Sequence, residues 1–399
     1  DLNTARTTLA GAGSQTSALA FGGGAATGTV AITESWNGSS WTEVADMAQA
    51  RVNLAGAGTT GTSALAIGGN NGGTSYALTE EFTAATITDT IKNEGQVYYN
   101  TTTNLLKLTG VVNGVGAWSS GGALNVARGG AGGAGLQTSG LIFGGLNPTA
   151  TGSVAITESY DGTTWTEVAD LTTARNSFGA QAGTQTAALA AGGSGTTNTE
   201  TWNGLSWTEV NVMAAAQQIS GSFGTSTSAV TGGGISGSPR STVSQSWDGT
   251  NWTSSTATNT ARNALAGFGN SNTSGLIFGG SEPAKSAKTE EWNGSSWTER
   301  ADLNTARDYL NGAGSTAEGL AIGGRNPGVL AVTESWDGTS WTEVADLATA
   351  RLEGSSSGTS TAAFIAGGST NPGTGSPFTD ATEEWNVPEI VTNLTVASS

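Results

Sequence analysis

The sequence predicts an all-β protein, a β-propeller of four-stranded antiparallel blades. The first observation is repetition: Thr33–Gly69 returns in the same residue order as Thr333–Gly368, and eight copies of this unit occur along the chain. The second is that each copy, of roughly 45 residues, divides into four short strand-like runs, as a propeller blade does. The third is composition: 62 glycines among many serines and threonines leave no segment with a 3.6-residue apolar period, so no helix is expected.

The four strands are expected at the same places in every copy. The second run is apolar without alternation and ends in Gly-Gly, which favours a strand covered on both faces. In the first copy the four runs are Leu9–Ala12, Ala18–Phe21, Ile32–Trp36 and Trp41–Val44.

A tight hairpin is expected between the third and fourth strands, because Asn37-Gly38 supplies the positive φ values that such a turn needs. If this is a two-residue loop, Trp36 pairs with Ser39. Glu34, Trp36 and Trp41 would then lie on one face of the sheet.

All 13 tryptophans fall at two positions of the repeat, and Phe82 and Tyr160 fill the first position in two further copies. A residue needed once for a ligand would not recur in every copy, so we interpret these aromatic residues as blade packing. The first position holds Trp36, Trp202, Trp247, Trp292, Trp336 and Trp385, and the second holds Trp41, Trp118, Trp165, Trp207, Trp252, Trp297 and Trp341.

An arginine and a glutamate also recur in seven copies, and the copy that lacks one lacks the other. That copy has Gln217-Gln218 and Gln245 instead. Joint loss is expected of a bonded pair, since removing one partner leaves a partly buried charge uncompensated. We therefore predict an Arg–Glu ion pair within or between neighbouring blades. The arginines are Arg6, Arg51, Arg128, Arg175, Arg262, Arg307 and Arg351, and the glutamates are Glu34, Glu80, Glu158, Glu200, Glu290, Glu334 and Glu383.

Composition excludes several function classes. The chain has no cysteine and no histidine, which removes disulfides, Cys/His metal sites and histidine-dependent nucleophiles. A net charge of −17 argues against nucleic-acid binding, and no apolar run is long enough for a membrane helix. Trp336–Trp341 resembles the Asp-box of sialidases only slightly, because asparagine replaces its aspartate in other copies. No catalytic, cofactor-binding or metal-binding residue is predicted, and no enzyme.

The repeat resembles the kelch repeat. The resemblance rests on an apolar strand ending in Gly-Gly, then Glu-x-Trp/Tyr, then Trp-Thr-x-Val-x-x-Met/Leu-x-x-Ala-Arg. It covers nearly the whole chain outside residues 83–117. One departure is that the two aromatic positions are only five apart, as in Trp292 and Trp297, which implies a shorter hairpin. The regular NTAR and WTE segments also resemble reading frames of marine tailed phages, and GQVYYNTTTNLLK resembles a short motif of tail-fibre proteins.

Four regions are expected: two kelch-like blades at 1–82, a β-rich connector at 83–116, a six-bladed kelch-like propeller at 117–386, and a C-terminal strand and tail at 387–399. In the connector, Thr86–Ile91 is an apolar-containing run, and Gly95–Asn100 and Leu105–Leu108 are expected to pair as a hairpin. It serves equally well as a linker or as a recognition element.

The preferred six-bladed ring closes when Trp118–Ser120 adds a fourth strand to the unit Arg351–Trp385. Residues 1–82 would then end a preceding ring, with the chain truncated or processed at its N-terminus, because Asp1 begins in mid-repeat. The alternative is a single eight-bladed ring with the hairpin inserted in its second blade.

The resemblance implies a non-enzymatic virion structural protein, a tail fibre or other external appendage of a tailed phage. Its partners would be other virion proteins and a host-surface glycan or protein, without nucleic acid or membrane insertion, and a homo-oligomer is compatible with this role. The alternative is a secreted or cell-surface bacterial or archaeal adhesin or glycan-binding propeller. Loops that follow Gly-Gly, all expected on one face, are the candidates for host contact, although tolerated length variation explains them equally well. They are Asn70–Tyr76, Asn147–Ser153, Glu282–Lys288, Arg325–Leu330 and Thr370–Phe378.

Overall fold

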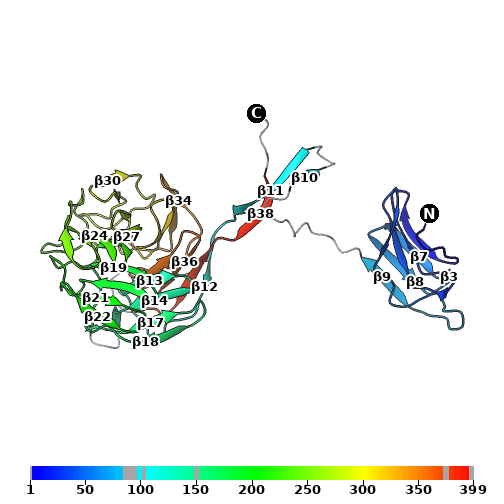
Figure 1. Ribbon diagram of the computed structural model, residues 1–399, viewed down its shortest axis with the longest axis horizontal. Coiled ribbons are helices and arrows are strands. Elements are labelled where there is room, and N and C mark those ends of the chain that lie inside the picture. Colours follow the sequence, from blue (N-terminus) through cyan, green and yellow to red (C-terminus); the bar gives the residue numbers. More distant parts are fainter. Residues whose placement is uncertain (1, 84–96, 101–104, 148–151, 372–376, 395–399) are drawn as a thin grey trace. The chain divides into compact units, whose positions relative to one another are not determined.

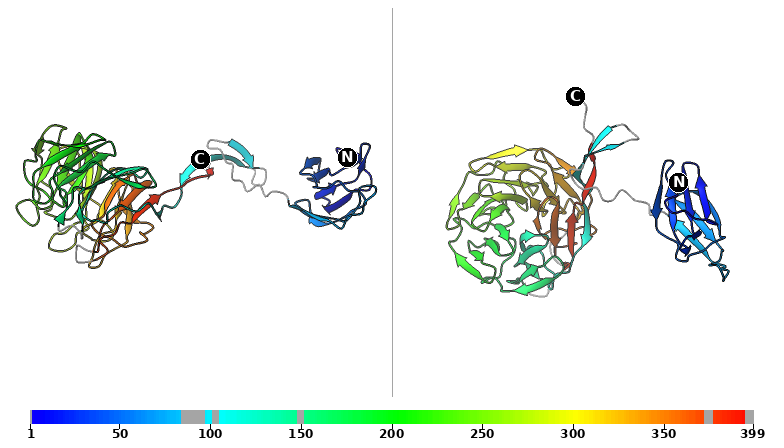
Figure 2. Two further views of the ribbon diagram at one scale, coloured as in Figure 1. Left: turned by 90° about the horizontal axis from the view of Figure 1, so that it is seen from below. Right: turned by 45° about the vertical axis from the view of Figure 1, so that its right-hand side comes forward.

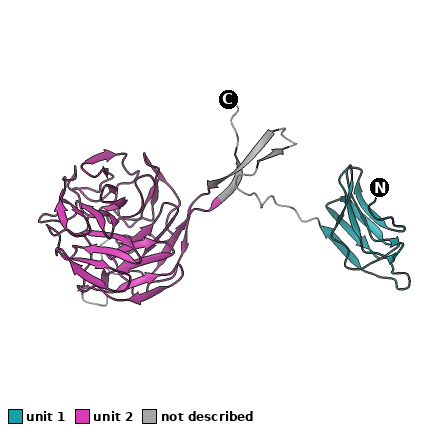
Figure 3. Cartoon of the chain, in the orientation of Figure 1, with its two compact units in different colours: residues 1–93 teal, residues 94–399 magenta. Residues whose placement is uncertain are grey.

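The computed structural model describes residues 2–83, 97–100, 105–147, 152–371 and 377–394, and in these ranges every regular element is a β-strand. The chain forms two compact units, residues 1–93 and 94–399 (Figure 3). The all-β class predicted from the repeats is confirmed. The expected run Thr86–Ile91 lies outside the described residues.

The first unit contains two blade-like antiparallel sheets and a short ribbon (Figure 1). The first sheet has the order β1-β2-β5-β6 and the second has the order β7-β8-β9. Their bounds are β1 Ala10–Ser14, β2 Ser17–Phe21, β5 Thr33–Trp36, β6 Trp41–Val44, β7 Ala55–Thr60, β8 Ser63–Ile67 and β9 Thr79–Thr83, and the ribbon is β3 Gly24–Ala25 with β4 Gly28–Thr29.

The second unit contains six four-stranded sheets, which Figures 1 and 2 show arranged around a common centre. In five of them the four strands follow one another along the chain. The small ribbon of β15 (Leu146–Asn147) and β16 (Gly152–Ser153) is inserted between β14 and β17 in one of these sheets. The five sheets are β13 Gly132–Leu136, β14 Ser139–Phe143, β17 Thr157–Tyr160 and β18 Trp165–Val168; β19 Ala180–Thr184, β20 Ala187–Ala191, β21 Thr199–Trp202 and β22 Trp207–Val210; β23 Gly221–Thr225, β24 Ser228–Gly232, β25 Ser244–Trp247 and β26 Trp252–Ser254; β27 Ala266–Ser271, β28 Ser274–Phe278, β29 Thr289–Trp292 and β30 Trp297–Arg300; and β31 Asn311–Gly314, β32 Gly319–Ile322, β33 Thr333–Trp336 and β34 Trp341–Glu343.

The sixth sheet joins distant parts of the sequence. Its order is β35 (Ser355–Gly358), β36 (Ala362–Ala366), β37 (Thr382–Asn386) and β12 (Ala117–Ser120). Trp118 of β12 lies opposite Trp385 of β37. The strand pairing expected of Trp118–Ser120 is therefore present, and it covers an edge of β37 that would otherwise lack a partner.

A three-stranded sheet combines the connector with the C-terminal strand. β10 (Val97–Asn100) pairs with β11 (Leu105–Asn113), as the hairpin prediction required, and β11 pairs with β38 (Glu389–Leu394).

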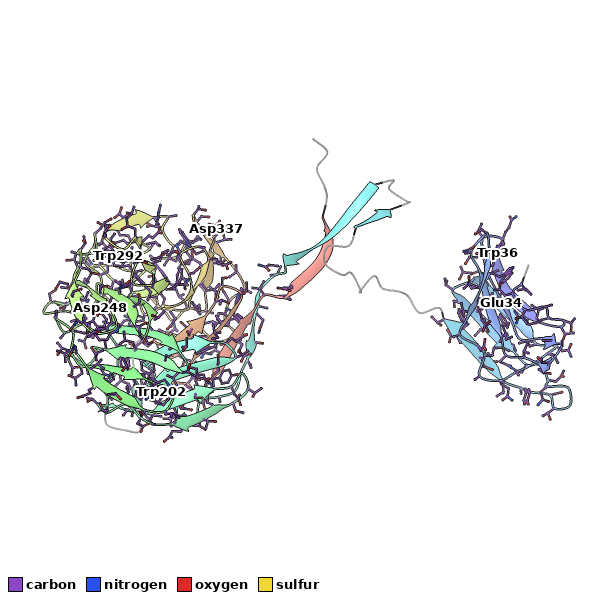
Figure 4. The ribbon with its side chains drawn as sticks, viewed as in Figure 1. Glu34, Trp36, Trp202, Asp248, Trp292 and Asp337 are labelled. Atoms are coloured by element: carbon purple, nitrogen blue, oxygen red, sulfur yellow. The ribbon has the colours of Figure 1, made fainter. Side chains whose placement is uncertain are left out.

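The predicted two-residue hairpin loop was wrong. Trp36 lies opposite Trp41, so four residues connect the strands. The Asn37 side chain explains the longer loop, because its Oδ1 accepts the backbone N–H groups of Ser39 and Ser40, each at 2.9 Å. The two indoles pack directly across the strands with centroids 5.4 Å apart. Figure 4 labels Trp36 and Glu34 in the first unit. The new register still places Glu34, Trp36 and Trp41 on one face.

The core lies between successive sheets, and the tryptophans take part in it as predicted. In β14, Leu141, Ile142 and Phe143 are fully buried. Phe143 packs edge-on against Trp207 of the next sheet, with centroids 4.8 Å apart, and the Trp207 indole donates to Thr157 Oγ1 at 3.0 Å. The same indole-to-threonine bond recurs between other sheets, in Trp252–Thr199, Trp341–Thr289, Trp165–Thr382 and Trp118–Thr333.

The innermost strands of the six sheets contact one another in chain order, and the last, β35, contacts the first, β13. Next to these strands, the residue two positions after each repeat arginine of the second unit, or after Gln217, has a positive φ of 47–61°. Each of these residues donates its backbone N–H to the carbonyl of its counterpart in the preceding sheet, at 2.7–3.0 Å, and the six bonds form a closed cycle. Its members are Gly130, Ser177, Ile219, Ala264, Tyr309 and Glu353.

Candidate functional site: repeated ion pairs, a central cavity and a charged loop cluster

The predicted Arg–Glu pairs are present in all seven copies and lie within single sheets. Arg262 is typical: it is buried, and its Nη2 lies 2.7 Å from Glu290 Oε1. Its Nη1 donates to the carbonyls of Gly279 and Lys288, both at 2.7 Å. The second carboxylate oxygen accepts the backbone N–H of Asn259 at 2.6 Å. The other pairs are Arg6–Glu34, Arg51–Glu80, Arg128–Glu158, Arg175–Glu200, Arg307–Glu334 and Arg351–Glu383.

The copy that lacks the arginine, the fifth along the chain, has a neutral version of the same network. Gln217 Nε2 donates to the carbonyls of Gly233 at 2.9 Å and Val243 at 3.0 Å, and its Oε1 accepts from Gln245 Nε2 at 2.5 Å. Gln245 Oε1 accepts the N–H of Ala215. Gln217 is thus the structural counterpart of the arginines. The network ties the Gly-Gly turn to the third strand with or without charge, so its role is architectural.

The hairpin aspartates also have a structural role. Asp337 Oδ1 accepts a hydrogen bond from the Thr339 hydroxyl and from the backbone N–H groups of Thr339 and Ser340. The Thr339 hydroxyl contributes most to lowering the pKa of Asp337, followed by the backbone N–H groups. An anion held this way supports a turn, and asparagine replaces it in other copies with the same geometry.

A cavity of about 590 Å³ lies among the innermost strands of the second unit. Glycine and small polar residues dominate its wall, including Gln181, Ser222 and Ser356. Among the described residues that line it, Glu318 is the one that carries a charge. In the part of the chain that the structure describes, no three acidic side chains gather in a way that could hold a metal ion. The cavity therefore offers mainly hydroxyl, amide and backbone groups, with the Glu318 carboxylate as the charged group among its described lining residues.

Charged side chains that are not repeated gather where two of the predicted loops meet. Asp308, with its side chain 3% exposed, pairs with Lys285 of the loop Glu282–Lys288. It also pairs with Arg325 of the loop Arg325–Leu330, whose Nε and Nη2 each lie 3.1 Å from a carboxylate oxygen. The Arg325 guanidinium lies over the Tyr309 ring, 4.9 Å from its centroid. We call Lys285, Asp308, Tyr309, Arg325 and Glu353 the loop cluster.

Glu353 adds a titratable group to the loop cluster. Burial raises its pKa to about 7; Asp308 acts in the same direction and Arg325 opposes it. Burial also raises the pKa of the Tyr309 hydroxyl, and the charges of Glu353 and Asp308 add to this. The cluster therefore changes its net charge near neutral pH.

Sequence reasoning identified the two loops but missed Asp308, Tyr309 and Glu353. The available signal was departure from the repeat: at the position of Asp308 the other copies carry Thr7, Val52, Gly129, Asn176, Gln218, Asn263 and Leu352. Of the remaining candidate loops, Asn70–Tyr76 is described in full. Residues 148–151 of Asn147–Ser153 and 372–376 of Thr370–Phe378 lie outside the described residues.

No protein-family model matches this sequence, and none of the curated proteins compared with it matches either. The described residues include no helix with the length and apolarity to cross a membrane.

Proposed function

We propose that residues 117–386 form a six-bladed kelch-like propeller and that the protein is a non-enzymatic component of a tailed-phage appendage. The cyclic N–H to C=O bonds and the strand pairing of Trp118 with Trp385 support the ring. The kelch-like repeat and the tail-fibre-like GQVYYNTTTNLLK motif support the assignment to a virion. We place the two blades of 1–82 and the connector 83–116 in the same appendage.

The proposal that the protein attaches to the host rests on the loop cluster. Its charged residues occur once, while the buried charges of the Arg–Glu pairs recur in copy after copy. Lys285 and Arg325 place two cationic side chains beside Tyr309 and a single carboxylate, and this arrangement suits recognition of an acidic host-surface group. The ligand we propose is a host-surface glycan or protein.

Catalysis is not part of the proposal. A hydrolase acting through paired carboxylates needs two acids that face one substrate bond. The repeat glutamates are occupied by arginine, and Asp308 is occupied by two cations. A glycan-cleavage assay on host envelope material should therefore show no turnover. Cleavage that disappears on changing one carboxylate would contradict this reading.

Two experiments test the function. Antibodies against the chain should decorate the tails of intact particles in electron micrographs, and genes for tail or baseplate proteins should flank its gene. Decoration of uninfected cells instead would favour the secreted adhesin.

In the second experiment, the fluorescently labelled chain should bind host cells. Arg325→Ala should weaken this binding, while Arg300→Ala, outside the loop cluster, should not. Equal binding by both variants would reject the loop cluster as the contact site.

A further inference from the structure

Four basic side chains lie outside the repeated network, in loops that leave equivalent ends of three consecutive sheets of the second unit. Apart from the seven repeat arginines and Arg300, every lysine and arginine whose side chain the structure describes belongs to this group. Arg240 lies in the loop after β24, Lys285 and Lys288 lie in the loop after β28, and Arg325 begins the loop after β32. We call these four residues the basic arc.

Hydrogen bonds and ion pairs join the three loops to one another. The side-chain amide of Asn263 donates to the carbonyl of Pro239, which precedes Arg240, at 2.8 Å. The backbone of Asn263 also forms a bridge with Ser281, where the second loop begins. The loop cluster joins the second loop to the third through the carboxylate that a cation from each loop shares. The three loops therefore form one connected surface.

Positive charge exceeds negative charge on this surface, although the chain has a net charge of −17. Among the described residues Arg240 has no carboxylate partner. Lys288 lies 3.5 Å from Glu282, and the single carboxylate of Asp308 pairs with both other cations. Glu353 adds a further carboxylate, but burial raises its pKa to about 7, so it is only partly ionised at neutral pH.

The composition of the three loops limits the kind of anion that suits them. They contain no aromatic residue, which argues against stacking of nucleotide bases. None of the exposed large apolar side chains in the described part of the chain lies in these loops, which argues against insertion into a membrane. Hydroxyl groups lie beside the cations instead, as where Lys288 Nζ donates to Thr260 Oγ1 at 3.2 Å.

The spacing of the loops favours an extended ligand. Stacked sheets pack roughly 10 Å apart, so the first and third loops are separated by roughly 20 Å. One carboxylate or sulfate group cannot contact all three loops at that separation. A polymer that carries acidic groups at intervals along its length can do so.

We propose that the basic arc binds an extended acidic polysaccharide, whose carboxylate, sulfate or phosphate groups contact the cations of the three loops. This inference rests on the proposed attachment to the host and names the chemical class of the ligand. Arg240 contributes a cation that no carboxylate of the described chain already holds. Lys288 contributes a cation beside a hydroxyl, which can bond to the sugar hydroxyls between the acidic groups.

Defined polymers test the proposal with the purified full chain. Polygalacturonate supplies carboxylates, dextran sulfate supplies sulfates, and neutral dextran is the uncharged control. In isothermal titration calorimetry the chain should bind the acidic polymers and not neutral dextran. Raising NaCl from about 50 mM to about 500 mM should weaken this binding at least about tenfold, because salt screens exposed charges. Monomeric galacturonate should bind at least about tenfold more weakly than its polymer, since it contacts one loop at a time.

Substitutions outside the loop cluster test which residues make the contact. Arg240→Gln and Lys288→Gln should each weaken polymer binding about fivefold, which is the range of an exposed charge pair. Arg300→Gln removes the same charge from β30 and should leave binding unchanged. Circular dichroism of each variant verifies that it is folded.

Several results would overturn the proposal. They are no binding of either acidic polymer, equal binding of neutral dextran, an equal loss in Arg300→Gln, and tighter binding to phosphatidylglycerol vesicles than to either polymer. Binding to host cells that depends on Arg325 but is not inhibited by the acidic polymers would overturn this inference alone. In that case the proposed attachment to the host would stand, with a ligand of another class.

Discussion

Replacing Arg262 by glutamine should destabilise the second unit strongly, because it removes the partner of a buried carboxylate. The guanidinium neutralises Glu290 at 2.7 Å and holds the carbonyls of Gly279 and Lys288. Breaking a buried pair from one side costs about 3–5 kcal/mol, most of it from the charge left uncompensated. We therefore expect Arg262→Gln to lower the free energy of unfolding by about that amount.

The protein contains the control for this experiment. In the fifth copy a Gln217–Gln245 pair makes the corresponding bonds at 2.5–3.0 Å without any charge. The double variant Arg262→Gln/Glu290→Gln copies that arrangement, so it keeps the bonds to the two carbonyls. Its cost should be only about 0–1.5 kcal/mol, the net worth of an exchanged hydrogen bond. The second substitution should therefore restore stability that the first removes.

Urea unfolding followed by tryptophan fluorescence measures these values, with the transition of the second unit fitted separately. Arg300→Gln is the surface control: its pair with Glu291 is 47% and 25% exposed on the two side chains and should contribute less than about 1 kcal/mol. The reasoning is refuted if Arg262→Gln costs no more than Arg300→Gln, or if the double variant is less stable than Arg262→Gln alone.

Three further predictions follow from single contacts. The folded-state pKa of Glu353 is about 7, above its ordinary 4.5, so the free energy of unfolding decreases as the pH rises from 4.5 to 7. Glu353→Gln should therefore add about 1–3 kcal/mol to that free energy at pH 8 and nothing at pH 4. Equal shifts of the urea midpoint at both pH values would disprove this. Trp207→Phe removes the donor to Thr157 and should lower the free energy of unfolding, measured by calorimetry, by about 1–2 kcal/mol. Adding Thr157→Val to this variant should lower it little further, because both substitutions remove the same bond. Additive losses would contradict a shared bond. Gly267→Ala places a Cβ within 2.9 Å of two backbone carbonyl oxygens and should lower the free energy of unfolding by about 1–3 kcal/mol. Gly328→Ala has open space around the added Cβ and should change the melting temperature little. Similar changes for both variants would reject close packing of the inner strands.

Features repeated in every copy could be predicted from the sequence, and geometry that depends on competing local options could not. The run Leu141–Phe143 predicts a strand covered on both faces because no polar residue interrupts it, and all three side chains are buried. Asn37-Gly38, by contrast, suits a two-residue turn and also a longer loop capped by the asparagine side chain. The Trp36–Trp41 contact favours the longer loop. This contact depends on side-chain packing across the strands, and the residue pattern alone does not show which of the two loop lengths packs better.

The loop cluster was missed for a different reason. Asp308 follows Arg307 directly, so in the sequence it reads as one more charge beside a repeat position. Its partners Lys285 and Arg325 lie 23 and 17 residues away, in loops that only the sheet order brings together. Comparison of the copies position by position isolates Asp308, because repetition defines which side chains the scaffold requires.

The position of Asp308 indicates how the repeat separates positions that the scaffold requires from positions that can vary. In seven of the eight copies the backbone there forms an antiparallel bridge to the residue after Gly-Gly, as in Thr7 with Gly24 and Leu352 with Ser369. The side chains at this position share no chemistry, so the fold fixes the backbone and leaves the side chain free. Charged groups can then be placed at the loop end of a sheet without changing the buried Arg–Glu network. Removing the Asp308 carboxylate by substitution with asparagine should therefore affect host binding more than folding, because uncharged side chains already occupy this position in the other copies.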